Sequence, residues 1–344
     1  MKVILSVIGV LLILLVSAYE FRKDSDPVDY VDPMIGTTME GNVSPNVGVP
    51  FGMTQWTPQT RSPGKKGVPP YQYYDPMIQG FRASHWLSGG ATQDYGSMTL
   101  MPIVGPLKTD PLDRASSFSH KHEISTPYYY RVGLKDYGIT AEMTATAHSG
   151  FLRFRFPKSD SSFVIIDANA GYQAATTNTT GDGFIRIIPE KNEIVGFDPV
   201  YRIYQGWGKP AGFSGYFAIR FMQPFDSYGI WNAGGYAEDD STQSHDRPIA
   251  YVRFKTGNGE DIEVKVGMSF TSIGEAEKNL DKEIPTWNFD HTRYITRMTW
   301  DKQLGRVEVS GGSREEKETF YTALYHSFQL PREISNADST YVSF

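Results

Sequence analysis

The stretch Gly150-Phe-Leu-Arg-Phe-Arg-Phe156 decides the fold class of this sequence. From Phe154 to Phe156 its side chains alternate apolar, polar and apolar, which is the pattern of an antiparallel strand with one buried face. Similar runs occur on both sides, separated by segments rich in Gly, Pro, Asn and Asp. Many strands joined by turns, with no long helices between them, predict a mainly β fold of two large stacked sheets. The other clear strands are expected at residues 128–134, 162–166, 184–187, 215–221, 249–254 and 262–270.

The sequence changes character after Thr271. Residues 290–304 lack Gly and Pro and predict a helix, and residues 306–309 predict a short strand. Ser313 and Glu316 then form the sequence signature of a capping box, which marks the start of a second helix. The chain is therefore expected to pass from a β domain into a helical region.

The second predicted helix carries an apolar stripe. Phe320, Leu324 and Phe328 are spaced by four residues, so they share one helix face, with Tyr321 and Tyr325 beside them. We expect the stripe to pack on a helical domain that follows.

The composition excludes several classes of function. The 344 residues contain 40% hydrophobic and 21% charged residues, as in a globular protein, and the net charge of −6 argues against a nucleic-acid partner. The absence of cysteine excludes disulfides, thiolate catalysis and cysteine-ligated zinc. Aromatic residues make up 14%, which suits either stacking on sugar rings or a large β core.

The start of the chain has the pattern of an export signal. Lys2 precedes an apolar run over residues 3–16, and small residues around Ala18 suit cleavage after it. We therefore expect a signal peptide over residues 1–18, a polar linker over residues 19–30, and an exported, periplasmic or extracellular protein with no stable membrane span after cleavage. A retained signal anchor is the alternative.

Common cofactor motifs are not found in the sequence. His120 and His122 would share one face of a strand, with Glu123 nearby, but a third metal ligand is not evident. Ordinary hydrogen-bonded surface histidines are the favoured explanation of the pattern, so no metal site is assigned. Acidic residues are too numerous for spacing alone to select the acid and base of a glycosidase.

Residues 71–102 are the densest unusual segment. They contain Gly80-Phe-Arg-Ala-Ser-His-Trp-Leu-Ser-Gly-Gly90 and Asp94-Tyr-Gly-Ser97. Glycine-rich loops that carry His, Trp, Arg and Asp suit recognition of hydroxyls and ring faces. The alternative is a structural loop held by its own hydrogen bonds.

Several motifs, in order along the chain, resemble glycoside hydrolase family 92. They include Val31-Asp-Pro-Met-Ile-Gly36, the two loop motifs of residues 80–97, Asp136-Tyr-Gly-Ile139, and Thr319-Phe-Tyr-Thr-Ala-Leu-Tyr-His-Ser327. The resemblance extends over residues 31–344. The last motif is the most specific of the set.

The resemblance implies a two-domain plan. Residues 31–270 would form a galactose-mutarotase-like β-supersandwich, and residues 271–344 a helical linker and the start of a truncated catalytic (α/α)6 barrel. Members of the family are calcium-dependent, inverting exo-α-mannosidases. Their acid, base and most calcium ligands lie in the barrel, so this chain is expected to be inactive alone, with calcium needed only by the intact enzyme.

The resemblance also supplies substrate-binding candidates. His85, Trp86 and Asp94 match the loop that would face the sugar, and Asp338 matches an acid just after the last helix. No catalytic or metal-binding residue is assigned to this chain. The expected partners are a mannose-containing glycan of the N-glycan or mannan type and the missing barrel. The alternatives are a stand-alone glycan-binding protein without hydrolysis, or an incomplete gene product.

Overall fold

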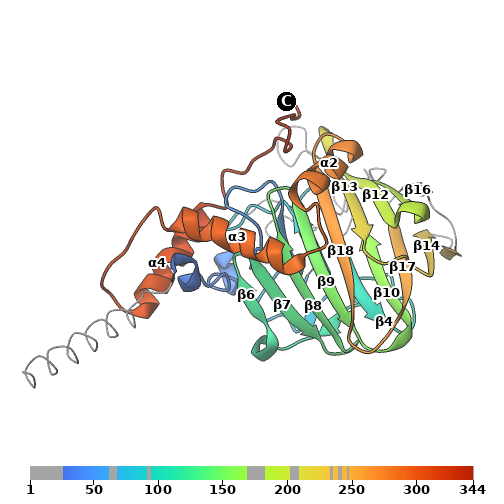
Figure 1. Cartoon of the computed structure of the whole chain (residues 1–344), viewed down its shortest axis with the longest axis horizontal. Coiled ribbons are helices and arrows are strands. Elements are labelled where there is room, and N and C mark those ends of the chain that lie inside the picture. Colours follow the sequence, from blue (N-terminus) through green and yellow to red (C-terminus); the bar gives the residue numbers. More distant parts are fainter. Residues whose placement is uncertain are drawn as a thin grey trace, which may run out of the picture.

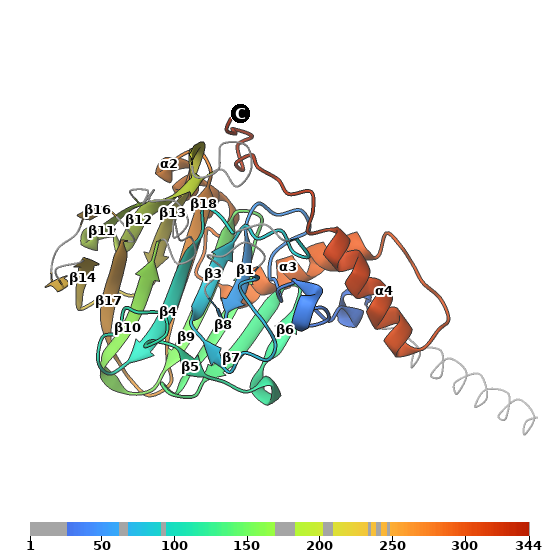
Figure 2. The ribbon, with the colours of Figure 1, turned by 180° about the vertical axis from the view of Figure 1, so that it is seen from behind.

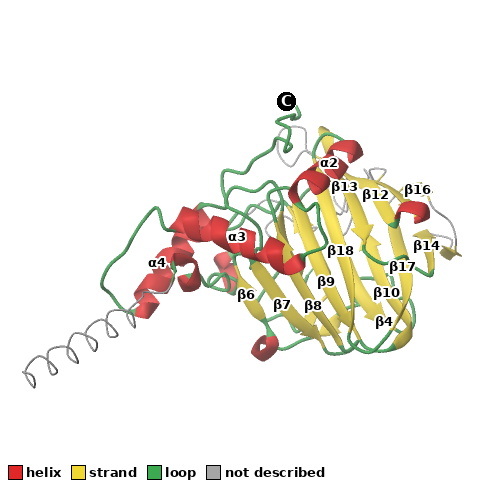
Figure 3. Cartoon of the chain, viewed as in Figure 1, coloured by secondary structure: helices red, strands yellow, loops and turns green. Residues whose placement is uncertain are grey.

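The computed structural model describes residues 26–61, 68–90, 94–168, 183–201, 209–232, 235–238, 242–245 and 248–343, so the predicted signal peptide lies outside the described residues. Two antiparallel sheets stack face to face, and helices gather at one side and one end of the sandwich (Figures 1 and 3). The mainly β fold predicted from the sequence is confirmed, and so are all seven strands expected from the aromatic and β-branched runs.

The sheet nearer the viewer in Figure 2 has seven strands. Neighbouring strands pair antiparallel throughout. Their order is β1 (Gln55–Gln59), β3 (Gly80–Ser84), β4 (Met98–Val104), β10 (Ser159–Asp167), β17 (Ile249–Thr256), β14 (Ser227–Asn232) and β15 (Gly235–Glu238).

The sheet nearer the viewer in Figure 1 has nine strands, and a two-stranded sheet of β2 (Met77–Ile78) and β5 (Ser116–Ser117) lies apart from it. The order of the nine is β16 (Thr242–His245), β11 (Gly183–Ile188), β12 (Glu193–Tyr201), β13 (Pro210–Phe221), β18 (Glu260–Ser269), β9 (Ser149–Phe156), β8 (Ile139–Ala145), β7 (Tyr129–Leu134) and β6 (Ile124–Thr126).

The alternation in β9 explains how the sandwich closes. Phe154 and Phe156 point inward and are buried in the core between the sheets. Arg155 points outward and forms a bidentate ion pair with Asp261 on the neighbouring strand β18. At Gly150 the indole of Trp56 from the other sheet comes so close that an added Cβ would lie 2.1 Å from it, so only glycine fits there.

Three helices follow the sandwich: α2 (Ile273–Glu283), α3 (Phe289–Leu304) and α4 (Arg314–Ser327). The helices α3 and α4 and the capping box of Ser313 and Glu316 confirm the prediction. Helix α2 was not predicted; the Ser272 hydroxyl caps it by accepting from the amide of Glu275. The three helices do not form a separate layer, because α2 packs on β18 and β13, and α3 on β8 and β9.

The predicted strand at residues 306–309 is wrong. These residues form a loop, because no neighbouring described strand is available to pair with them. Instead, the hydroxyl of Tyr321 on α4 donates to the carbonyl oxygen of Val307 at 3.1 Å and lies 3.4 Å from the amide of Val309.

The buried face of α4 carries tyrosines, while Leu324 and Phe328 of the predicted stripe are only partly buried. Tyr321 and Tyr325 are its buried aromatic residues, and they pack on Val28, Tyr30 and Trp300. Phe320 is 37% exposed. The last residues of the predicted linker form a 3-10 helix, η1 (Pro27–Tyr30), so this end of the linker belongs to the packed body.

After α4 the chain returns to the sandwich. Glu333 donates its amide to the carbonyl of Phe51 at 2.8 Å. Buried Asn336 then joins this segment to α2 and to the end of β18, through Asn279 and Ser269. The last described residues lie beside α2 in Figure 1. We call residues 329–343 the return segment.

Candidate functional site

Asp94 is the centre of the loop that joins β3 to β4. Its Oδ2 accepts from Arg82 Nε at 2.5 Å and from the Ser84 hydroxyl at 3.1 Å. Its Oδ1 accepts from the backbone amides of His85 at 2.8 Å and Tyr95 at 3.0 Å. Burial alone would raise the pKa of Asp94, but the Arg82 guanidinium and these bonds outweigh it and hold the pKa below its usual value. The buried carboxylate is therefore ionised and fully bonded.

His85 is enclosed beside Asp94, with 1% of its surface exposed. Its Nδ1 lies 2.8 Å from the carbonyl oxygen of Tyr95, and its Nε2 lies 3.0 Å from the hydroxyl of Thr54. Because a carbonyl can only accept, Nδ1 carries the proton and Nε2 accepts from Thr54. Burial lowers the pKa of His85 to about 4, so the ring is neutral at neutral pH.

Trp86 has no exposed surface. Its indole Nε1 donates to the carbonyl oxygen of Asn42 at 3.3 Å, and its amide donates to the Ser84 hydroxyl at 3.0 Å. Its carbonyl oxygen accepts from Arg332 of the return segment. Trp86 thus holds three distant parts of the chain together, and its ring faces are covered in this structure.

Asp338 lies apart from the other three predicted binding residues. It is exposed, and its Oδ1 accepts from the amide of Thr340 at 3.0 Å and from its hydroxyl at 2.6 Å. These two bonds lower the pKa of Asp338. The structure therefore brings His85, Trp86 and Asp94 together and leaves Asp338 on the surface of the return segment.

Arg332 belongs to the same site and was not predicted. Its guanidinium reaches the Trp86 carbonyl and lies 3.4 Å from the side-chain oxygen of Gln55. Burial lowers its pKa. Arg332 and Trp86 are 246 residues apart, so no local sequence signal could have joined them. We call Arg82, Ser84, His85, Trp86, Asp94 and Arg332 the loop cluster.

A second unpredicted residue is Asp198 on β12. It is buried, and its Oδ2 accepts from the amide of Ser97 at 3.0 Å. Burial raises the pKa of Asp198 well above its usual range. A buried acid in a strand gives no pattern in the sequence that distinguishes it from the other acidic residues.

The accessible aromatic side chains near the loop cluster are Tyr95 and Phe213, and not Trp86. Tyr95 and Phe213 are half-buried, with ring centroids 6.3 Å apart, and both rings pack against buried Phe270. The His85 ring centroid lies 4.7 Å from that of Phe270 and 5.4 Å from that of Tyr95. Any ring-face contact with a ligand at this place would therefore use Tyr95 or Phe213 first.

The loop cluster positions groups and does not transfer protons as arranged here. The hydrogen-bonding sites of Asp94 are occupied, and both nitrogens of His85 are bonded. Among the described residues, no group of three or more His, Asp or Glu is placed to hold a metal ion. Calcium stays a prediction for the intact enzyme.

His120 and His122 do not lie on a strand, and that expectation is wrong. They belong to a 3-10 turn, η3 (His120–His122). His120 bonds Glu123 through Nδ1 at 2.5 Å and the Tyr73 carbonyl through Nε2 at 2.8 Å, and its ring stacks on Tyr73 at 3.9 Å. Both nitrogens of His120 are thus used within the chain.

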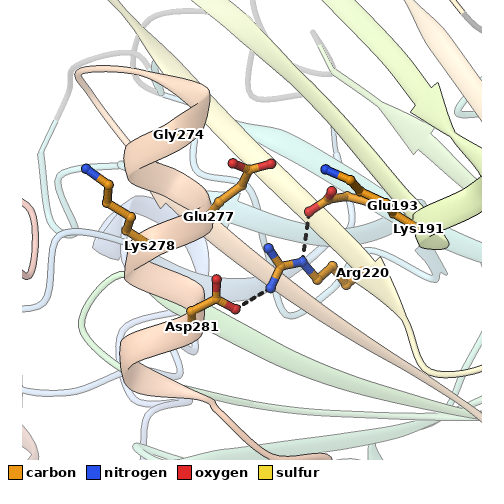
Figure 4. A pocket seen from close by; sticks show the side chains of 7 residues that line it. All are labelled: Lys191, Glu193, Arg220, Gly274, Glu277, Lys278 and Asp281. Atoms are coloured by element: carbon orange, nitrogen blue, oxygen red, sulfur yellow. Dashed lines mark hydrogen bonds and ion pairs between the residues drawn. The ribbon is translucent and has the colours of Figure 1, made fainter.

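Two open recesses lie outside the loop cluster. One, of about 590 Å³, lies between α2 and strands β12 and β13, and Figure 4 shows Arg220 bridging Glu193 and Asp281 across it. Its remaining lining is Gly274 with Lys191, Glu277 and Lys278. The other, of about 330 Å³, lies between α3 and the edge of the nine-stranded sheet.

Two family models match the chain in succession. Residues 30–269 match the glycosyl hydrolase family 92 N-terminal domain, and residues 275–344 match the glycosyl hydrolase family 92 catalytic domain. A curated fungal relative, an uncharacterized secreted glycosidase of Arthroderma benhamiae, is 23% identical over 360 residues. The match covers 96% of this chain and 45% of the fungal protein.

Solved structures agree with the family models. The GH92 inverting mannosidase BT2199 from Bacteroides thetaiotaomicron VPI-5482 has 32% identity and a TM-score of 0.82, over 94% of this chain and 42% of that protein. The GH92 α-mannosidase BT3965 from Bacteroides thetaiotaomicron has 30% identity and a TM-score of 0.81, over 91% of this chain and 42% of that one. The chain thus spans less than half the length of these relatives.

Proposed function

The chain belongs to glycosyl hydrolase family 92, and we propose that it is the sugar-contacting amino-terminal half of an inverting exo-α-mannosidase. The proposed substrates are α-mannosides of N-glycans or mannans. The two solved relatives described above are mannosidases, and one is described as inverting. We propose that the loop cluster helps to form the wall of the mannose site.

One contact carries this proposal. Arg332 lies in the stretch that matches the catalytic domain, and it donates to the carbonyl of Trp86 in the sandwich domain. Ligand sites form preferentially where two domains meet. This contact supports the proposal that the loop cluster lies at the junction between the two domains, within reach of a sugar bound by the catalytic domain.

The sandwich would contribute binding and orientation to the reaction. Inversion requires an acid that protonates the glycosidic oxygen and a base that activates water on the opposite face. We propose that both are supplied by the rest of the catalytic domain, since Asp94 and His85 are saturated. Ionised Asp94 would hold the backbone of His85 and Tyr95, so that the half-buried Tyr95 ring keeps a fixed place.

The proposal also includes a requirement for calcium and export of the protein. We propose that the intact enzyme requires calcium, which would be held by oxygen ligands from the rest of the catalytic domain. The protein would act in the periplasm or outside the cell, in keeping with the description of the fungal relative as secreted. Among the residues that the structure describes, no helix is long and apolar enough to cross a membrane.

The test compares this chain with the intact enzyme that continues it through the catalytic domain. We expect the intact enzyme to release mannose from α-linked mannobiose in the presence of calcium, with inverted anomeric configuration in the first minutes by ¹H NMR. The 344-residue chain alone should show no turnover. Retention of configuration would contradict the mechanism. Hydrolysis by the purified short chain that disappears on mutating one of its own acids would contradict the location of the acid and base.

A further inference from the structure

The recess beside α3 has the shape and the rigid walls of a binding site. It is about 330 Å³ in volume, within the usual range for small-molecule sites. Its floor comes from the first residues of strand β7, its upper wall from α3, and its outer lip from β6, the edge strand of the nine-stranded sheet. In Figure 1, α3 crosses in front of this end of the sheet.

The floor is held in place by buried bonds. The Tyr129 hydroxyl donates to Glu142 at 2.6 Å, and Arg153 holds the same carboxylate at 2.8 Å. The Arg293 guanidinium lies over the Tyr129 ring, 4.8 Å from its centroid. A ligand would therefore meet a surface that does not need to be ordered on binding, which lowers the entropic cost of association.

The charges in the recess are compensated within the chain. Arg297 donates to Asp26 at 2.9 Å and is also bonded to Asp29, and Arg293 lies 3.5 Å from Asp290. A free anion would have to displace these partners. The recess thus favours a neutral ligand that can use the remaining donors and acceptors of Arg, Asp and Thr126.

Aromatic side chains supply the apolar part of the recess. Tyr128, Tyr129 and Tyr294 all line it, but Tyr129 is buried beneath Arg293, so the rings open to a ligand are half-buried Tyr128 and Tyr294, which is 57% exposed. Ile124 of β6 is 43% exposed. Tyrosines offer an apolar ring face together with a hydroxyl. A pyranose has the matching chemistry, because one face is apolar and its edge carries hydroxyls.

The larger recess in Figure 4 provides the contrast. It is lined by Lys, Glu, Arg and Asp side chains and Gly274, without an aromatic ring. It lacks a surface on which a sugar ring could stack. The smaller recess is therefore the better candidate for a sugar site because of its lining residues and not because of its volume.

We propose that the recess between α3 and the β6–β7 edge is a second carbohydrate-binding site, which takes one or two neutral hexose units. It shares no residue with the loop cluster. It would hold a neighbouring branch or a more distant unit of a glycan while another end is processed. The inference rests on the proposed function only in the choice of mannose as the first sugar to test.

The experiment titrates the 344-residue chain with α-1,2-mannobiose and, for comparison, with maltose, and follows binding by ligand-observed NMR and calorimetry. We expect saturable binding that Tyr294→Ala and Arg293→Ala each weaken by about tenfold. The matched control is Tyr74→Ala, since Tyr74 is 67% exposed but lies outside the recess. It should bind like the unaltered chain.

Thermal unfolding of the same variants serves to check that each of them is folded. No saturable binding of either disaccharide by the unaltered chain would overturn the proposal. Binding that Tyr294→Ala and Arg293→Ala leave unchanged would also overturn it, and a concurrent loss in Tyr95→Ala would move the sugar to the loop cluster. If the recess binds and the intact enzyme proves inactive on mannosides, the second site stands while the proposed hydrolase function fails.

Discussion

Two buried histidines on the same sandwich have pKa values shifted in opposite directions. Burial lowers the pKa of His85 in the loop cluster to about 4. Burial also acts to lower the pKa of His148, but there Glu283 outweighs it and the pKa is raised. The Nδ1 of His148 lies 2.5 Å from Glu283 Oε1, and its Nε2 lies 2.7 Å from the carbonyl of Ser335.

The opposite pKa shifts of the two histidines come from their hydrogen-bond partners and not from the depth of burial. The His85 ring bonds one carbonyl and one hydroxyl, whereas His148 bonds a carboxylate that stabilises its cationic form. The loop cluster therefore combines a neutral histidine with the buried Arg82–Asp94 ion pair and the guanidinium of Arg332. The His148–Glu283 pair instead joins the start of β9, the end of α2 and the return segment by charge. The following predictions test this contrast in order of decreasing effect.

Asp94→Ala should have the largest effect on stability. It would leave the guanidinium of Arg82, whose side chain is 1% exposed, without the carboxylate of Asp94. Breaking a buried pair in this way costs about 3–5 kcal/mol of unfolding free energy. The matched control is Asp261→Ala, whose partner Arg155 is 53% exposed and should lose about 1 kcal/mol or less. Chemical denaturation of both variants measures the difference, and equal losses would contradict the central role of Asp94.

Acid should destabilise the protein through His85. The pKa in the folded state is about 4, below the unfolded value near 6.5, so the unfolded state binds the proton first. Stability is therefore lost as the pH falls from about 6.5 towards 4, by about 3 kcal/mol for this one group. Unfolding free energies at these two pH values should fall less in His85→Gln than in the unaltered chain. Identical pH dependence would show that His85 has the same pKa in the folded and unfolded states.

Local patterns accounted for most of the fold and for part of the site. The alternation around Phe154 gave the sandwich, and the capping box at Ser313 gave the start of α4. His85, Trp86 and Asp94 could be grouped because they are neighbours in sequence. Helix α2 was missed, because it is short and contains Gly274 in its first turn, where helix propensity is low.

Contacts between distant residues could not be predicted in this way. His148 and Glu283 are 135 residues apart, and neither lies in a motif. The enclosure of Trp86 depends on Asn42 and Arg332, which approach it only after the return segment folds back. From the sequence, glycines and serines around a tryptophan favoured an open loop, but long-range packing covers the indole completely.

Glu283→Gln should have an intermediate effect that depends on pH. The raised pKa of His148 stabilises the fold below about pH 6.5, and this contribution is lost as the pH rises through the folded-state value. Glu283, whose pKa is lowered in the folded state, stabilises the fold above about pH 4.5. The variant should therefore lose about 1.5–3 kcal/mol between about pH 4.5 and 6.5, and less above that window.

The control for this variant lies on the same helix. Glu275 pairs with Lys278, which is 67% exposed, so Glu275→Gln should cost about 1 kcal/mol or less and show little pH dependence. Denaturation at pH 6 and pH 9 separates the two variants. A Glu283→Gln loss that is equal at both pH values would mean that neutral hydrogen bonds, and not the charge of His148, hold the return segment.

Asp338→Asn should have the smallest effect on stability and is the sharpest test of the predicted sugar contact. Asp338 is exposed, and the amide oxygen of Asn can accept the same bonds from Thr340, so the midpoint of denaturation should not change. Asp110→Asn is the matched control, because exposed Asp110 likewise accepts from the backbone amide two residues later, at Leu112. If the carboxylate of Asp338 bonds a mannose hydroxyl in the intact enzyme, its loss should lower kcat/KM by roughly tenfold to a hundredfold, as expected for a hydrogen bond to a charged group. Asp110→Asn should leave kcat/KM unchanged. Equal kcat/KM values in both variants would remove Asp338 from the binding residues and leave the loop cluster as the part of this chain expected to contact the sugar.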